Sequence, residues 1–219
     1  MRRPLLQSLI ALMLILGFLS TPSTANAVPA TTKNPSSISV VVNKKNPLRP
    51  KTYKPSRLIS VGNGQSLRPA PAAAYKKMVA AAARQGHRIY PISGYRSYTT
   101  QRSTYNYWVS KYGISYANRI SAKPGYSEHQ TGLTIDVGDS RYGCALNTCF
   151  GKLRSGRWLA ANAHKYGFIV RYPAGKEYST GYSYEPWHFR YVGETTATKI
   201  KKSGKTLEQH FGYPAAPRY

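Results

Sequence analysis

Apolar side chains recur at helical spacing near the middle of the chain. The stretch 99–112 carries four of them at positions i, i+3, i+4 and i+7: Tyr105, Trp108, Val109 and Tyr112. This spacing is one face of an α-helix, and we expect that face to point into the core. Gly113 follows directly and predicts the end of the helix.

Two further helices are predicted from start and stop signals. The stretch Pro69–Arg84 is rich in alanine, opens with prolines and ends just before Gly86. The stretch 155–166 has Ser155 in the N-cap position and Gly167 directly after its end. Each stretch is therefore expected to form one helix with the boundaries given.

Alternation of apolar and polar residues predicts the strands. Leu133, Ile135 and Val137 alternate with Thr134 and Asp136, which puts the Asp136 carboxylate on the face away from the aliphatic side chains. Strands are also predicted for 88–93, 168–172 and 187–192. Because helices and strands do not alternate as βαβ units, we predict an α+β domain whose helices pack around a small antiparallel sheet.

The N-terminal third has a different composition. Residues 1–27 hold two arginines, an apolar stretch and Ala25-Asn26-Ala27, which indicate a secretory signal peptide. The apolar stretch is too short for a membrane span, so no stable span is expected after cleavage, although an uncleaved anchor is an alternative. Residues 28–66 predict a basic arm or linker rich in Pro, Ser and Lys, with an ordered lead-in at 41–48, and the domain is expected at 67–219.

Charge narrows the choice of partner. Without residues 1–27 the chain carries 30 basic and 7 acidic side chains, a net charge of +23. Such a balance predicts an anionic partner, and for an exported protein the polymers of a bacterial cell wall are the nearest one. Export argues against nucleic acid. A role of the charge in solubility alone is the alternative.

The chain has two cysteines, Cys144 and Cys149, in a polar stretch. An even number of cysteines in an exported chain predicts a disulfide, which would close a small loop. A metal site is the less favoured interpretation, because no second cysteine pair or nearby histidine accompanies them.

Candidate chemistry is concentrated in two short strings, 127–136 and 185–188. They bring together His129, Asp136 and His188, three residues that would give Zn²⁺ three protein ligands and leave one position open, as in catalytic zinc sites. Glu185 would remain free to act as a base. In a regular strand Glu185 and His188 would lie on opposite faces, but Pro186 disrupts the ladder, so we expect a bulge or bend that aims both at one point.

Three strings resemble one known family: SGYRS (93–97), SEHQTGLTID (127–136) and YEPWHFRYVG (184–193). They are similar, in the same order, to the VanY-type zinc D-alanyl-D-alanine carboxypeptidases, a family that includes peptidoglycan carboxypeptidases and wall endopeptidases. The resemblance implies an α+β fold, grouped with the hedgehog signalling domain, that carries zinc on an antiparallel sheet.

The resemblance also implies roles for individual residues. His129, Asp136 and His188 would bind zinc, Glu185 would be the general base and acid, and Arg96 would contact the substrate and stabilise the oxyanion. Two further residues match positions near the terminal residue of the substrate: Ser127 and Gln101.

The resulting hypothesis is a secreted, cell-wall-associated zinc metallopeptidase that trims peptidoglycan stem peptides as a D,D-carboxypeptidase, acting as a monomer. L,D-carboxypeptidase, wall endopeptidase and D-Ala-D-Ala dipeptidase activities are alternatives within the family. A wall-binding module without turnover is an alternative of another class, but such a module would have little need for the Glu185 carboxylate. A nucleic-acid-binding protein is the least favoured, because the lysines and arginines do not follow one helix or strand face.

Overall fold

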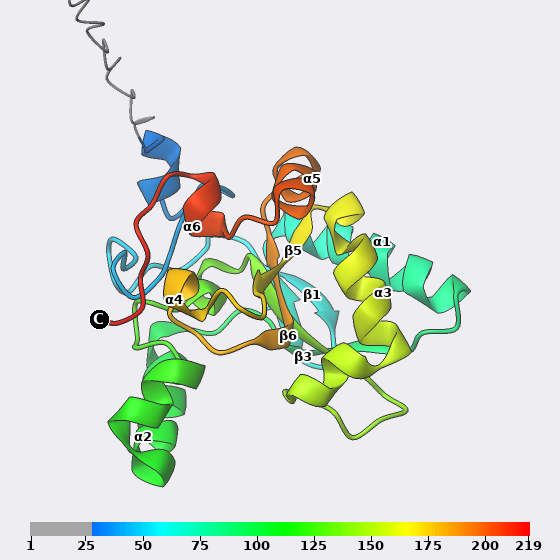
Figure 1. Cartoon of the computed structure of the whole chain (residues 1–219), viewed down its shortest axis with the longest axis horizontal. Helices are drawn as coiled ribbons and strands as arrows, with labels where there is room; N and C mark the ends of the chain where they lie inside the picture. Colours follow the sequence, from blue (N-terminus) through cyan, green and yellow to red (C-terminus); the bar gives the residue numbers. More distant parts are fainter. Residues whose placement is uncertain (1–27) are drawn as a thin grey trace, which may run out of the picture.

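A four-stranded antiparallel sheet forms the centre of the molecule in the computed structural model, which describes residues 28–219 (Figure 1). The strand order is β3-β4-β6-β5. These strands are β3 (Ile89–Ser93), β4 (Thr134–Asp139), β5 (Phe168–Tyr172) and β6 (Glu185–Tyr191). A separate hairpin precedes them, formed by β1 (Ile59–Gly62) and β2 (Gln65–Leu67). The predicted small antiparallel sheet is confirmed.

Helices lie around this sheet and supply the other half of the predicted α+β class. The α-helices are α1 (Pro69–Arg84), α2 (Tyr98–Ile120), α3 (Arg154–Asn162), α4 (Glu177–Thr180), α5 (Glu194–Ser203) and α6 (Leu207–His210). Four 3₁₀ helices complete the described part: η1 (Ala30–Lys33), η2 (Glu128–Thr131), η3 (Thr148–Lys152) and η4 (Ala163–Tyr166).

One face of the sheet is closed by α1 and α3, which lie side by side (Figure 1). Ile135 and Val137 of β4 and Phe189 of β6 form the sheet side of this core, and Met78 of α1 and Leu159 of α3 pack onto them. Alternation along β4 sends Asp136 to the opposite face. The core therefore holds the sheet rigid from one side and leaves the other side for polar side chains.

The boundaries of α1 are those predicted from the sequence, whereas those of α3 differ. The helix α3 begins at Arg154 with Leu153 as its N-cap, so Ser155 is not the capping residue. The Ser155 side chain is buried instead. At the other end η4 continues to Gly167, which has the left-handed conformation (φ 79°) expected of a residue that ends a helix.

The predicted orientation of the apolar face of α2 is wrong. Of its four residues only Tyr105 is buried; Trp108 and Val109 are half-buried and Tyr112 is 48% exposed. Gly113, with φ 78° and ψ 162°, breaks the helix, but a second helical stretch follows it to Ile120. Helical spacing identifies an apolar face without saying what that face contacts, and α2 projects away from the rest of the molecule (Figure 1).

Residues 28–66 pack against the rest of the chain and do not form a free linker. Val40, Val42 and Leu48 are buried in one cluster with Leu133, the residue before β4. The Arg190 guanidinium of β6 donates hydrogen bonds to the carbonyl oxygens of Val40 (2.6 Å) and Ile38 (3.0 Å). The ordered lead-in predicted at 41–48 is therefore present.

The predicted signal peptide, residues 1–27, lies outside the described residues. Between residues 28 and 219, no helix combines the length and the apolarity needed to cross a bilayer.

Candidate active site

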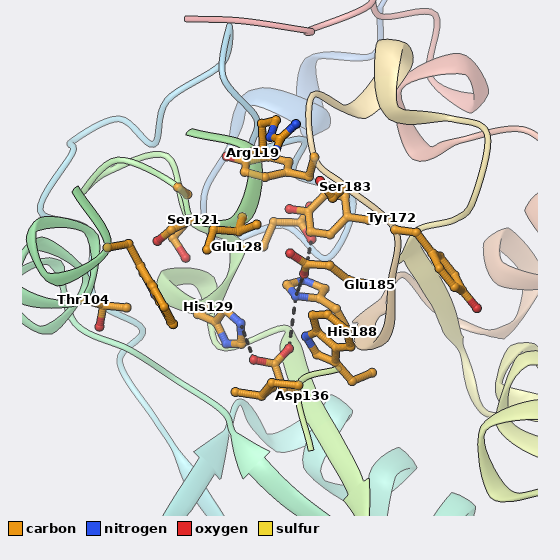
Figure 2. Close-up of a pocket in the computed structure, with 18 of the residues that line it drawn as sticks. Thr104, Arg119, Ser121, Glu128, His129, Asp136, Tyr172, Ser183, Glu185 and His188 are labelled. Carbon is orange, nitrogen blue, oxygen red and sulfur yellow. Dashed lines mark ion pairs between the residues drawn. The ribbon is translucent and has the colours of Figure 1, made fainter. Parts of the chain in front are cut away.

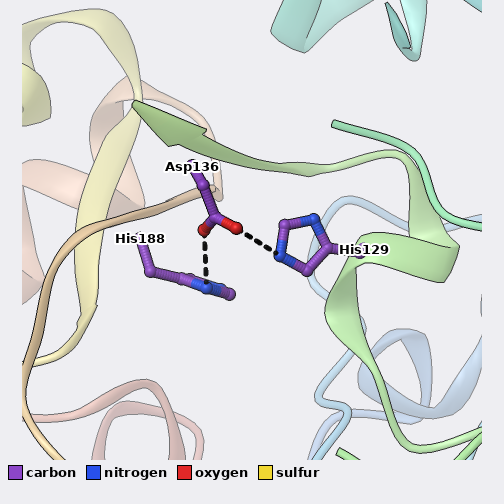
Figure 3. A group of neighbouring side chains, drawn as sticks. All are labelled: His129, Asp136 and His188. Carbon is purple, nitrogen blue, oxygen red and sulfur yellow. Dashed lines mark ion pairs between the residues drawn. The ribbon is translucent and has the colours of Figure 1, made fainter. Parts of the chain in front are cut away.

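The three candidate metal ligands meet on the open face of the sheet (Figure 3). Asp136 on β4 and His188 on β6 are direct cross-strand partners, and η2 brings His129 over them. The Asp136 carboxylate lies between the two imidazoles: Oδ2 is 3.2 Å from His129 Nε2, and Oδ1 is 3.1 Å from His188 Nδ1. One ligand atom from each residue lies within 4.8 Å of the others, and all three side chains are buried.

The second nitrogen of each imidazole faces a fixed acceptor. His129 Nδ1 lies 2.7 Å from the carbonyl oxygen of Gly94, which leaves Nε2 as the free nitrogen toward Asp136. A side chain at position 94 would approach the Ser66 carbonyl oxygen to 2.5 Å, so this close packing needs glycine. His188 Nε2 lies 3.9 Å from Glu128 Oε2. Outer-shell acceptors of this kind orient the imidazoles of metal sites.

The protonation states of His129 and Asp136 suit a metal site. Burial lowers the pKa of His129, which favours the neutral imidazole that a metal ligand requires. Burial alone would raise the pKa of Asp136, but the two imidazoles hold it well below the ordinary aspartate range. Asp136 Oδ1 and His188 Nε2 are buried without a hydrogen-bond partner. Two imidazole nitrogens and an ionised carboxylate at this spacing fit a first-row divalent cation.

Glu185 lies beside this group because β6 is irregular at its start. Val170 of β5 pairs with Phe189 of β6, and Tyr172 of β5 pairs with Glu185 of β6. Between these two pairs β5 advances by two residues and β6 by four, so β6 has two extra residues here. The predicted bulge around Pro186 is therefore present. It brings Glu185 Oε2 to 3.3 Å from His188 Nδ1, and burial raises the pKa of Glu185 above the ordinary glutamate value.

Arg96 lies in the same pocket, held by two hydrogen bonds. It donates to Gln101 Oε1 (2.8 Å) and to Ser93 Oγ (2.7 Å). Gln101 in turn donates to the Ala122 carbonyl oxygen at 2.7 Å, so both ends of its amide are used inside the protein. Gln101 and Ser127 line the pocket, and their position near a substrate stays a prediction. The hydrogen bond between Gln101 and Arg96 orients the guanidinium group.

Sequence reasoning missed Glu128, although it stands next to His129. Its Oε1 accepts hydrogen bonds from Arg171 (2.8 Å) and Arg190 (2.6 Å), and both guanidinium groups are fully buried. Burial alone would raise the pKa of Glu128, but these two arginines hold it well below the ordinary range. Arg171 also donates to Glu208 of α6. Its position next to His129 was the one feature of the sequence that could have pointed to Glu128. Its partners Arg171 and Arg190 lie far away in the sequence, on β5 and β6, so the ion pairs could not be predicted.

A cavity of about 680 Å³ connects these residues to the surface. Figure 2 shows Arg119 on the far side of this pocket from Asp136. The lining of the pocket includes residues of α2, among them Trp108, and the loop 145–148. The predicted disulfide between Cys144 and Cys149 is present and closes that loop. The two cysteines therefore fix a wall of the pocket.

Comparison with known proteins identifies the family. Residues 64–194 match the family model described as VanY, D-alanyl-D-alanine carboxypeptidase. The chain belongs to the VanY family. It is 42% identical over 190 residues to YodJ of Bacillus subtilis (strain 168), covering 83% of this chain and 69% of YodJ. The resemblance inferred from the three sequence strings is thus confirmed.

Solved structures of VanY-like enzymes share the fold. The LdcB LD-carboxypeptidase is 41% identical and superimposes with a TM-score of 0.75, covering 81% of this chain and 86% of LdcB. The D,D-pentapeptidase VanY from the VanB-type vancomycin resistance cassette, solved with Zn(II), is 32% identical with a TM-score of 0.69, covering 78% of this chain and 97% of that one. The neighbours of this chain therefore include both D,D- and L,D-carboxypeptidases.

Proposed function

We propose that this protein is a zinc-dependent D,D-carboxypeptidase that releases the C-terminal D-alanine of peptidoglycan stem peptides. The observation that carries the proposal is the position of Glu185 and Arg96 at the buried His129, Asp136 and His188 group, in a cavity of about 680 Å³. The zinc found in the related VanY structure supports the choice of metal.

The proposed metal ligands are His129 Nε2, His188 Nδ1 and an oxygen of Asp136. When bound, zinc supplies a Lewis acid that lowers the pKa of water and polarises the substrate carbonyl. The Gly94 carbonyl oxygen holds the other nitrogen of His129 and so fixes the direction of its Nε2, while the Glu128 carboxylate faces the other nitrogen of His188.

Glu185 is the proposed general base and acid. Its carboxylate lies next to the ligand group without being needed as a ligand, close enough to take a proton from an attacking water and to pass it to the leaving amine. The pKa of Glu185, raised by burial, suits both steps because the group can be deprotonated and reprotonated near neutral pH.

Arg96 is the proposed substrate contact. A guanidinium has five N–H donors, and the hydrogen bonds to Ser93 and Gln101 use two of them. The remaining donors are available to a substrate carboxylate or to the oxyanion that forms at the scissile carbonyl. The burial of Arg96 strengthens either contact.

L,D-carboxypeptidase activity is a second candidate. The observation that favours it is the greater likeness to LdcB, with 41% identity and a TM-score of 0.75, than to the D,D-pentapeptidase VanY, with 32% and 0.69. Both candidates release a terminal D-residue with a free carboxylate. They differ in the configuration of the residue on the other side of the cleaved bond.

A comparison of peptide ends tests the proposal. We expect release of D-alanine from a stem pentapeptide ending in D-Ala-D-Ala, and cleavage of its C-terminal amide about 100-fold more slowly, because an amide cannot accept two charge-assisted hydrogen bonds from Arg96. Mass analysis of the products gives both rates. Cleavage of the tetrapeptide but not the pentapeptide would select the L,D candidate. Equal rates on the acid and the amide would contradict carboxypeptidase activity.

The pH dependence of metal binding provides a second prediction. In the metal-free protein burial lowers the pKa of His188, but Asp136, Glu128 and Glu185 outweigh this and raise it well above the ordinary histidine value. Metal binding must therefore displace a proton from His188, and we expect the apparent zinc affinity to fall about tenfold for each pH unit lowered. Competition with a chromophoric chelator between pH 8 and 6, corrected for protonation of the chelator, measures this slope. A flat profile would contradict the predicted protonation of His188.

A further inference from the structure

Three aromatic residues of α2, Trp108, Tyr112 and Tyr116, form a row along the side of the helix that lines the cavity. The rings of Trp108 and Tyr112 are stacked, with centroids 5.7 Å apart and planes 13° from parallel. Tyr116 continues the row, with its ring centroid 4.9 Å from that of Tyr112. Tyr112 and Tyr116 are 48% and 41% exposed. Large aromatic side chains that remain accessible in a row mark a binding surface more often than a packing defect.

This row is continuous with the active site. Trp108, Tyr112 and Tyr116 line the same cavity as His129 and Glu185. The disulfide-closed loop 145–148 also lines this cavity. A molecule held at His129 and Glu185 can therefore reach these rings without leaving the cavity.

The positions of the rings along α2 indicate how long a bound molecule must be to reach them from the catalytic residues. Gln101, which holds Arg96, starts the wall, and Trp108 and Tyr112 follow it by seven and eleven residues. At 1.5 Å per residue the rings lie about 10 to 17 Å along the helix from Gln101. An extended peptide covers about 3.3 to 3.6 Å per residue, so three to five residues span this distance. The rings lie where the group attached to the N-terminal end of a stem peptide would arrive.

We propose that the row formed by Trp108, Tyr112 and Tyr116 is a carbohydrate subsite that stacks on the amino sugar carrying the stem peptide. This inference rests on the proposed function. A pyranose ring presents C–H groups on its faces and hydroxyls at its edge, so it packs on an aromatic face while its hydroxyls stay in water. The enzyme would thus favour stem peptides still attached to the glycan over free peptides.

Three substrates with the same peptide test this subsite. They are the free stem peptide, its N-acetylated form and a muropeptide that carries the disaccharide on the N-terminus. The acetylated peptide separates the effect of the sugar from loss of the terminal positive charge. We expect the wild-type protein to cleave the muropeptide with about tenfold higher kcat/KM than the acetylated peptide, through a lower KM, and Trp108→Ala to lose that ratio.

The control variant is Tyr178→Ala, which removes a 77% exposed tyrosine that does not line the cavity. It should keep the wild-type ratio. A wild-type ratio near one, or equal loss of activity of Trp108→Ala on both substrates, would overturn the subsite. If neither muropeptide nor acetylated peptide is cleaved by the wild-type protein, the proposed function fails.

Measurements of ligand binding to an inactive variant test the carbohydrate subsite without relying on turnover. Calorimetry with Glu185→Gln should give about tenfold tighter binding of the muropeptide than of the acetylated peptide, and the double variant Trp108→Ala/Glu185→Gln should bind the two equally. Equal binding already in Glu185→Gln would overturn the sugar contact. Tighter binding of a cross-linked, sugar-free stem than of the muropeptide would also overturn it, in favour of a peptide occupant.

Discussion

Replacing Glu185 with glutamine is expected to lower kcat for D-alanine release by about 1,000-fold while the protein keeps its metal, because the amide cannot take a proton from water. Glu185 lies beside the three proposed metal ligands but is not one of them, so the metal content should stay at one ion per chain. The rate comes from assays of released D-alanine and the metal content from elemental analysis of the same preparation.

The pH profile of the wild-type protein checks the same role. A base works when ionised, so kcat/KM should fall as the pH drops through the Glu185 pKa, which burial raises above its ordinary value of 4.5. Glu177→Gln is the matched control, because that carboxylate is exposed and outside the pocket lining, and it should keep full activity. Loss of the metal in Glu185→Gln would refute the separation between base and ligands.

Glu128→Gln is expected to lower the free energy of unfolding by about 3 kcal/mol at pH 7. The substitution removes the negative charge between Arg171 and Arg190, which leaves the buried Arg190 without a carboxylate partner and Arg171 with Glu208 alone. Denaturation in urea measures the difference. Glu194→Gln, at an exposed glutamate, is the control and should change stability by less than about 0.5 kcal/mol.

The sign of the pH dependence follows from the lowered pKa of Glu128. Its folded-state pKa lies below the ordinary value of 4.5, so the stability that its ionised form contributes is present above pH 4.5 and is lost as the pH falls further. The stability difference between the wild-type protein and Glu128→Gln should therefore narrow below pH 4.5. A constant difference would show that shape, and not charge, makes Glu128 necessary.

The Glu128 cluster links the ends of the described chain to the active site. Arg190 ties Glu128 to the segment around Val40, and Arg171 ties it to Glu208 of α6, which also accepts a hydrogen bond from Asn43 (3.1 Å). Glu128 Oε2 faces His188. The segment that composition alone assigns to an arm thus contributes to the surroundings of a proposed metal ligand, His188.

The sequence by itself determined the family of this protein and most of its local structure. Proline and glycine signals placed α1 correctly, alternation placed Asp136 on the face opposite Ile135 and Val137, and Pro186 indicated the bulge that turns Glu185 toward His188. These features depend on the backbone preferences of neighbouring residues, which a single sequence contains. The three family strings identified the family and supported the candidate ligand set of His129, Asp136 and His188.

Only the tertiary structure decided what the predicted elements contact. The apolar face of α2 has helical spacing whether it meets a core or a cavity, and the fold turns it toward the cavity. Glu128 gains its arginine partners from strands more than forty residues away, and the composition of residues 28–66 does not reveal that Val40 and Leu48 are buried. Burial and charge pairing are properties of the assembled chain, because they depend on residues that local patterns do not bring together.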